Sequence, residues 1–315
     1  KNNLQTYFLR CPQMANEVKY SSLIGPTTGG RISAVLSALV QEKLHDPTDL
    51  RAVMTLVPWG ASGSDTMDVT IDAAPGAFAS AAEAAATTNS PYVTSKFSLQ
   101  AVKKTRVYSL TDLFGVTGGP IDLEHVVKNL TDGVGLTMTD LLTTLFPSIS
   151  NSVGTSTAVL TLDDIYSAQY QLNLSAAMGP YTSVLSPKQM NEFRTSLRAE
   201  AGAIQYVPAS AEMLATKGPG FQGSWNGIDM YQSDSVESVT TTKVGAMFNS
   251  AAFAYTMAPA RSALVPQESV LVDAGELLVE IQRDAQAGIT RAVANIFAGV
   301  AEAQDAAAVG IITLA

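Results

Sequence analysis

The sequence predicts an α+β protein in which extended segments reach away from a folded body. Helical periodicity is confined to a few stretches, and runs rich in β-branched residues lie between and after them. The first 30 residues have little clean periodicity, so we expect an extended N-terminal arm. No internal repeat is visible in the 315 residues.

Composition indicates a chain that buries surface against partner subunits. Hydrophobic residues make up 46% of the chain and charged residues 15%, whereas about a quarter is charged in a typical soluble domain. Apolar surface left over in this way is most simply covered by further copies. The alternative is a globular protein that is merely rich in Ala, Ser and Thr.

Charge argues against a protein that wraps nucleic acid by neutralising phosphates, since the net charge is −9. The arm differs from the rest. Lys1, Arg10, Lys19 and Arg31 against Glu17 give it +3, which leaves −12 for the remainder. A solvated tail with stray charges is the simpler interpretation. The single Cys11 excludes an internal disulfide, and no apolar run approaches the roughly 18 residues of a membrane span.

Residues that could carry out catalysis are few, so we expect no enzyme, cofactor or metal. Neither His45 nor His125 stands in a recognisable catalytic or zinc-binding pattern, and there is no G-x-S-x-G or phosphate-binding glycine motif. The pair Asp163-Asp164 suits the start of a helix better than an acid/base dyad, because neighbouring helical residues point about 100° apart.

The first half of the chain predicts a hairpin and a long helix. Val- and Thr-rich runs at 51–58 and 67–71 flank a glycine-rich turn and are expected to pair with each other. A further β-rich run covers 96–110. Asp122 is a good N-cap for a helix reaching Phe146, about 35–40 Å long, which the glycines at 133 and 135 would weaken or bend.

The second half alternates capped helices with short strands. Thr161-Leu-Asp-Asp164 reads as a capping box, and Ser186-Pro187 as an N-cap with proline at the first helical position. Strands are predicted at Tyr181–Leu185, Trp225–Met230, Lys243–Tyr255, Glu276–Arg283, Arg291–Phe297 and Val309–Leu314.

This order of elements resembles the Hong Kong 97-like fold of tailed-phage major capsid proteins. The matching stretches are Thr161-Leu-Asp-Asp-Ile-Tyr166, Val184-Leu-Ser-Pro-Lys-Gln189, Trp225-Asn-Gly-Ile-Asp-Met230 with Ser233-Asp-Ser-Val236, Leu277–Asp284, Arg291-Ala-Val293 and Ala308-Val-Gly-Ile-Ile-Thr313. Together they span roughly residues 95–315, and their order supplies most of the specificity.

The resemblance implies four parts. These are an N-terminal arm and helix (1–49), an extended loop (50–98), a peripheral domain with a spine helix (99–159 and 261–301) and an axial domain (160–260 and 302–315). It also implies a structural protein that assembles into hexamers and pentamers of an icosahedral shell around double-stranded DNA, without sequence-specific binding. Portal, scaffolding and cement proteins are the further partners implied, and the virion, assembled in the host bacterial cytoplasm, is the implied location.

Two alternatives stay open at this level. An encapsulin-type nanocompartment shares the fold but encloses a protein cargo, and a carboxylate-based hydrolase would use a pair such as Asp163 and Glu192.

Five residues are expected at contacts between subunits. Trp59, Met67 and Val69 belong to the predicted hairpin, and an isolated hairpin is marginally stable in water, so it should order on a neighbour. Arg10 and Lys19 of the arm are expected against an acidic neighbouring surface or the genome. No covalent cross-link through the loop is expected, since residues 52–95 contain no lysine and Lys96 is assigned to the loop base.

Overall fold

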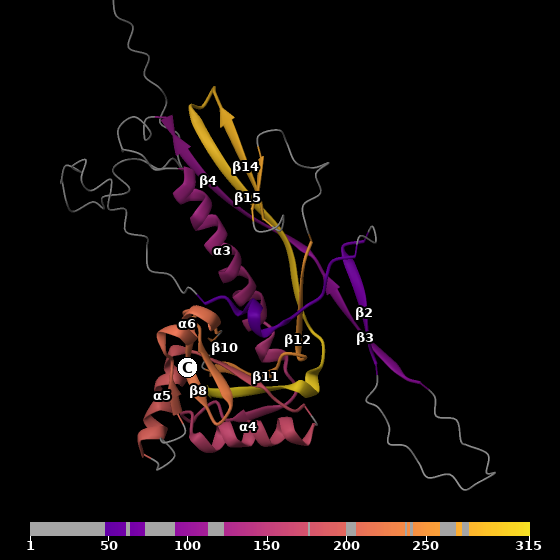
Figure 1. Cartoon of the computed structure of the whole chain (residues 1–315), viewed down its shortest axis with the longest axis vertical. Helices are drawn as coiled ribbons and strands as arrows, with labels where there is room; N and C mark the ends of the chain where they lie inside the picture. Colours follow the sequence, from indigo (N-terminus) through magenta and orange to yellow (C-terminus); the bar gives the residue numbers. More distant parts are fainter. Residues whose placement is uncertain are drawn as a thin grey trace, which may run out of the picture.

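The computed structural model describes residues 48–60, 64–72, 92–112, 123–175, 177–199, 206–236, 238–239, 242–258, 269–272 and 277–315. The arm with Arg10 and Lys19, the helix predicted from Ile32, and the proposed cap Asp122 lie outside these residues. In Figure 1 a long helix and long strands rise from a broader base of sheet and helices, while a two-stranded ribbon projects to one side.

The helices of the described residues are α3 (Leu123–Thr143), α4 (Leu162–Leu174), α5 (Pro187–Ala199) and α6 (Ala211–Lys217), with 3-10 turns at Leu50–Val53, Phe146–Ser148 and Asp305–Ala307. The strands are β1 (Thr55–Leu56), β2 (Thr66–Asp72), β3 (Thr94–Gln100), β4 (Val102–Thr111), β5 (Ser152–Gly154), β6 (Tyr181–Leu185), β7 (Tyr206–Pro208), β8 (Phe221–Trp225), β9 (Ile228–Gln232), β10 (Ser238–Val239), β11 (Thr242–Asn249), β12 (Phe253–Met257), β13 (Ser269–Val272), β14 (Leu277–Asp284), β15 (Ile289–Glu302) and β16 (Ala308–Leu314).

A six-stranded sheet packs against the long helix. Its order is β1-β12-β15-β14-β13, and β4 pairs with β15 from Val102↔Ala298 to Thr111↔Ile289. Helix α3 lies alongside these strands (Figure 1), and its buried residues Leu130, Val134, Met138 and Leu142 share one core with β14 and β15. The 21-residue helix is about 32 Å long and ends at Thr143, short of the predicted Phe146.

An eight-stranded sheet forms the base, in the order β5-β16-β11-β6-β9-β8-β7 with β10 on β11. Successive residues of its strands face opposite sides. Val244, Ala246 and Phe248 of β11 join the core that contains α3, whereas Met247 packs into a second core beneath α4 and α5. The base is therefore a sheet between two apolar layers.

Local helix signals in the base act as the sequence predicts. Thr161 and Asp164 form the reciprocal capping box, with the Thr161 Oγ1 accepting from Asp164 N. Ser186 Oγ accepts from Gln189 N at 3.2 Å at the start of α5. The buried Gln189 then cross-braces the sheet, because its Nε2 donates to Ile311 O and Thr313 Oγ1 of β16. The strands predicted at 181–185, 276–283 and 309–314 are also confirmed, with shifts of at most one residue. The strand predicted at 291–297 is confirmed but is twice as long, Ile289–Glu302.

Other predictions need correction. The runs at 51–58 and 67–71 do not form a hairpin with each other. Within the first run only Thr55–Leu56 is a strand, parallel to β12, while β2 pairs with β3 in the register Thr66↔Gln100 to Asp72↔Thr94. The run 96–110 is two strands that part at Ala101. The predicted strand 225–230 contains a turn at Asn226-Gly227, where both residues have positive φ, and the predicted 243–255 is two strands.

Candidate assembly surfaces

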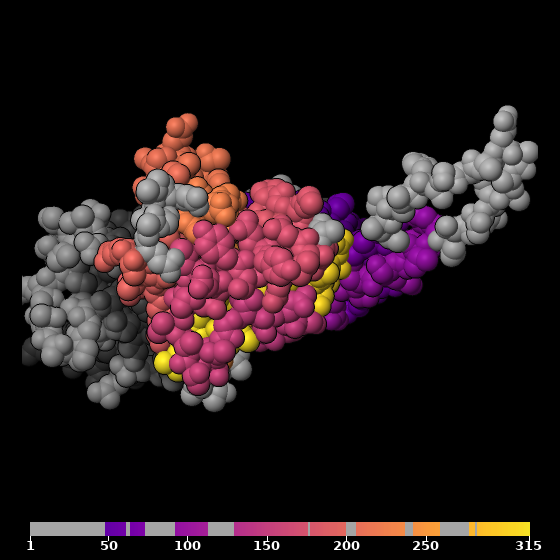
Figure 2. Space-filling view, turned by 90° about the horizontal axis from the view of Figure 1, so that it is seen from below, coloured from indigo at the N-terminus to yellow at the C-terminus, as the bar shows by residue number. Residues whose placement is uncertain are grey.

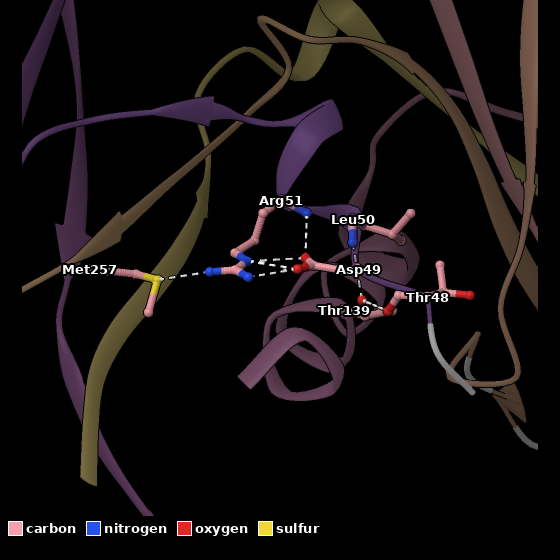
Figure 3. A network of polar contacts seen from close by, with 6 residues as sticks. All are labelled: Thr48, Asp49, Leu50, Arg51, Thr139 and Met257. Carbon is pink, nitrogen blue, oxygen red and sulfur yellow. Dashed lines mark hydrogen bonds and ion pairs between the residues drawn. The ribbon is translucent and has the colours of Figure 1, made fainter. Parts of the chain in front are cut away.

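A polar network joins the segment Thr48–Arg51 to helix α3 and strand β12 (Figure 3). Thr139 of α3 donates from its Oγ1 to Thr48 O at 2.8 Å and accepts from Leu50 N at 3.3 Å. Asp49 accepts from Arg51 N at 3.0 Å and pairs with the Arg51 guanidinium at 2.7 Å. Arg51 in turn reaches Met257 Sδ of β12 at 4.0 Å. Thr48 is the first residue that the structure describes, and this network fixes the segment to α3 and β12.

Two glycines create the room for that segment. A Cβ at Gly135 of α3 would lie 3.2 Å from the Asp49 side chain, and one at Gly220 would lie 2.3 Å from Thr48 Oγ1. Gly135 therefore admits a close contact in the middle of α3, which continues through it and through Gly133. The two glycines thus do not break the helix, and the weakening or bending predicted for them stays a prediction.

The β2–β3 hairpin forms a two-stranded sheet beside the body (Figure 1). The side chains of Met67, Val69 and Phe97 lie on the same face and are half-buried, and only Leu99 of that face is fully buried. The opposite face carries Asp68, Thr70 and Lys96 in solvent. Most of this face is therefore covered within the chain, and the exposed remainder of Met67, Val69 and Phe97 is available to a neighbour.

Glycine also sets where the hairpin leaves the body. A Cβ at Gly299 of β15 would lie 2.0 Å from Gln100 O, so the chain crosses β15 at a position where no side chain fits. Ala101 N donates to Asp65 O at 2.9 Å and closes the base of the hairpin. The hairpin therefore begins at Asp65 and ends at Ala101, and strands β2 and β3 extend outward from that pair of residues.

Lys96 lies within the hairpin rather than at its base. It pairs across from Thr70, and its Nζ is 3.8 Å from the Asp68 carboxylate. The expectation that no cross-link forms assigned Lys96 to the loop base, and that assignment is wrong, although residues 52–95 contain no lysine. The absence of a cross-link remains a prediction without this support.

Of the five predicted contact residues, the structure brings Met67 and Val69 together on one face of the hairpin. Trp59 lies after β1 with its side chain partly exposed, and neighbouring Gly60 approaches Met67, since a Cβ there would lie 3.8 Å from the Met67 Sδ. Arg10 and Lys19 are outside the described residues. Sequence reasoning missed the Thr48–Arg51 network, although Thr-Asp ahead of an apolar run is a usable cap signal.

Strand β4 presents a basic edge. Lys103, Lys104 and Arg106 are exposed and make no ion pair with any described residue, while the Arg106 guanidinium lies 5.3 Å from the Tyr108 ring centroid. Beside them a hollow of about 250 Å³ opens between β4 and α3 at Gly133. Such an edge attracts acidic surfaces or phosphates.

Two carboxyl groups, Glu302 at the end of β15 and Asp305 in the turn before β16, form a pair. Asp305 accepts from Ser150 N at 2.9 Å, and this bond lowers the pKa of the Asp305 carboxyl. Burial, together with the hydrogen bond and charge of Asp305, raises the pKa of Glu302 to about 7. One proton is therefore shared near neutral pH between the end of β15 and the turn that follows it.

Other chemistry is sparse among the described residues. They contain no group of three metal-ligating side chains, and no helix among them is long and apolar enough to cross a membrane. Glu192, half of the carboxylate pair considered above, accepts from Leu160 N at 2.9 Å and lies 3.9 Å from Lys188 Nζ. Its oxygens are used to brace α4 against α5.

Sequence comparison finds no match, because no protein-family model and no curated protein matches the chain. Structural comparison does. The capsid of Ralstonia phage GP4 matches with a TM-score of 0.62 at 12% identity, covering 96% of this chain and 98% of that one. The capsid of the cyanophage P-SCSP1u matches at 0.60 and 10%, covering 93% of each. A structure from Mycobacterium phage Che8 matches at 0.57 and 15%, covering 86% and 93%.

These matches span nearly the whole of both chains, so the likeness concerns the complete architecture and not one common motif. The chain has the Hong Kong 97-like fold of tailed-phage capsid proteins. The predicted fold class is thereby confirmed.

Proposed function

We propose that this chain is the major capsid protein of a tailed phage and self-assembles into an icosahedral shell around double-stranded DNA. The observation that carries the proposal is the end-to-end match to phage capsid structures, which cover 86–96% of this chain. A projecting hairpin with a partly exposed apolar face suits a shell subunit, since extended elements make contacts that a compact globule cannot. The role is structural and not enzymatic.

The proposed division into parts follows the predicted boundaries. The arm and its helix cover residues 1–49, the extended loop 50–98, the peripheral domain 99–159 with 261–301, and the axial domain 160–260 with 302–315. Most strands fit this division, because β4, β14 and β15 lie in one sheet and β6, β9, β11 and β16 in the other. Pairing also crosses the proposed boundaries, since β5 pairs with β16 and β12 with β15.

The proposed contacts between subunits use Trp59, Met67 and Val69 from the loop, and Arg10 and Lys19 from the arm. Met67 and Val69 have the best support, because they share one face and keep part of their surface exposed in the single chain. The partners we propose are other copies in hexamers and pentamers, together with portal, scaffolding and cement proteins. The protein would be located in the virion, and the shell would assemble in the cytoplasm of the host bacterium.

Microscopy of the purified protein tests the proposal. We expect closed shells by negative staining and a megadalton peak in size-exclusion chromatography. Particles from infected cells should contain double-stranded DNA, whereas a protein cargo would indicate a nanocompartment, an alternative that the three phage structures do not favour. A soluble monomer or dimer under all assembly conditions would contradict both shell functions.

A further inference from the structure

Helix α4 carries an apolar stripe on its outer face. Tyr166, Tyr170 and Leu174 follow one another at intervals of four residues, and Met178 is exposed in the loop just beyond the helix. Their exposed fractions are 42%, 63%, 67% and 74%. Scattered exposed apolar residues are ordinary, but four large ones in one segment mark an interaction surface. We call these four residues the α4 stripe.

Contacts with the rest of the subunit fix Tyr166 and the backbone at Met178, at the two ends of the α4 stripe. The Tyr166 ring stands edge-on to the buried Trp225 ring, with centroids 4.9 Å apart. Asn249 donates from its Nδ2 to Met178 O at 2.6 Å and fixes the loop after the helix. Side chains ordered in advance lose little entropy on binding, which makes tyrosines of this kind good anchors.

The face around the stripe is open to a partner. Helix α4 lies along the lower side of the molecule in Figure 1, and Figure 2 views that side from below, where the surface of residues 160–200 is broadly visible. On the inner side of α4, Ile165, Ala168 and Leu172 already fill the second core. Apart from the contact of Tyr166 with Trp225, the stripe is therefore left uncovered by the described part of the subunit.

Charge indicates what covers it. Helix α4 has Asp163 and Asp164 in its first turn and no basic residue, so the helix is acidic at its N-terminal end. The adjacent α5 carries Lys188, Arg194 and Arg198 against Glu192, and Arg198 is exposed. A contact of α4 with α5 of the next copy pairs opposite charges, whereas α4 against α4 brings together helices with acidic residues alone. A head-to-tail contact of this kind is what builds a ring.

We propose that the α4 stripe is an interface with a second copy of this chain, whose α5 side it meets. This inference rests on the proposed shell function. It names one surface through which copies meet, and it says that α4 of one copy contacts α5 of the next. It concerns a different part of the subunit from the β2–β3 hairpin.

Oxidation of the wild-type protein tests the interface without relying on any variant. Met178 is three-quarters exposed in the subunit, so dilute peroxide should convert it readily to the sulfoxide. In assembled particles we expect oxidation about tenfold slower, measured by peptide mass spectrometry. The fully buried Met138 should react slowly in both states and so reports that the subunit stays folded. Equal reactivity of Met178 in subunits and particles would overturn the proposal.

Substitution tests the same surface energetically. Tyr170→Ser with Leu174→Ser should raise the protein concentration needed for assembly by about tenfold per side chain, while circular dichroism of the subunit is unchanged. Ser167→Ala, exposed on the same helix but off the stripe, is the matched control. Assembly at the wild-type concentration would contradict an interface here.

A charge exchange tests the order of the contact. Asp163→Lys and Arg198→Glu should each weaken assembly at low salt, and the double variant should recover part of the loss. Additive losses would contradict the α4–α5 pairing. If the wild-type protein forms no particles at all, the shell function itself fails; particles with a reactive Met178 leave that function intact and reject only this interface.

Discussion

The base of the molecule and the β2–β3 hairpin are built from similar strands but keep very different amounts of apolar surface from water. In the base, the eight-stranded sheet is covered on both faces, and Phe193, Trp225 and Met247 are fully buried. The hairpin has two strands, and Leu99 is its one fully buried residue among those described. Strand formation is thus common to both, while burial within the subunit is not.

This difference indicates where each region obtains its stability. Residues of the base are stabilised by contacts within one chain, since burial of apolar side chains drives folding. The hairpin has few such contacts and would be stabilised by whatever it binds. Substitutions in the base should therefore act on subunit folding, and substitutions in the hairpin on assembly.

The largest effect is expected at the centre of the base. Phe193→Ala should lower the free energy of unfolding by about 3–5 kcal/mol, because it removes a ring packed 5.8 Å from Trp225 and leaves a cavity. Urea denaturation of dissociated subunits measures it. Thr195→Ala, exposed on the same helix, should change stability by less than about 0.5 kcal/mol. A loss below about 1 kcal/mol for Phe193→Ala would contradict the conclusion that the base is stabilised by contacts within one chain.

The next effect concerns the close contact between Thr48 and the base. Gly220→Ala would place a Cβ 2.3 Å from Thr48 Oγ1 and should cost about 1–3 kcal/mol through overpacking. Adding Thr48→Gly should recover part of that loss. Gly60→Ala is the control, since its Cβ meets only Met67 Sδ at 3.8 Å. Additive losses in the double variant would argue against this contact.

A pH dependence is expected from the Glu302–Asp305 pair. Burial and Asp305 raise the pKa of Glu302 from 4.5 to about 7, so the folded chain binds an extra proton between these values. Stability should therefore fall as pH rises through that window and level off above it. Glu302→Gln should flatten the slope in denaturation measured at pH 5 and pH 7.5, and Glu212→Gln on exposed α6 should not. An unchanged slope in Glu302→Gln would contradict the pair's role.

The smallest effect on the subunit is expected in the hairpin. Met67→Ser with Val69→Ser should lower the free energy of unfolding by about 1 kcal/mol, less than Phe193→Ala, because both side chains are only partly buried. Assembly, followed by light scattering, should nevertheless weaken. A large loss of subunit stability with normal assembly would show that the hairpin belongs to the subunit core after all.

Sequence alone determined the elements whose signals are local. The Thr161–Asp164 capping box and the Ser186-Pro187 start depend on residues three positions apart, and the structure has both. The apolar faces of α4 and α5 follow from helical spacing in the same way. The order of these elements also sufficed to predict the Hong Kong 97-like fold.

Tertiary structure alone decided which strands pair and which surfaces stay open. The run 67–71 could pair equally well with 51–58 or with 94–100 on hydrophobic pattern, and the choice of 94–100 depends on how the whole chain folds. Gly135 is unfavourable in a helix by propensity and Gly220 suits a turn, but only the fold shows that Gly135 makes room for Asp49 and Gly220 for Thr48. The α4 stripe shows the same limit: spacing puts its residues on one face, but only packing reveals that this face is left uncovered.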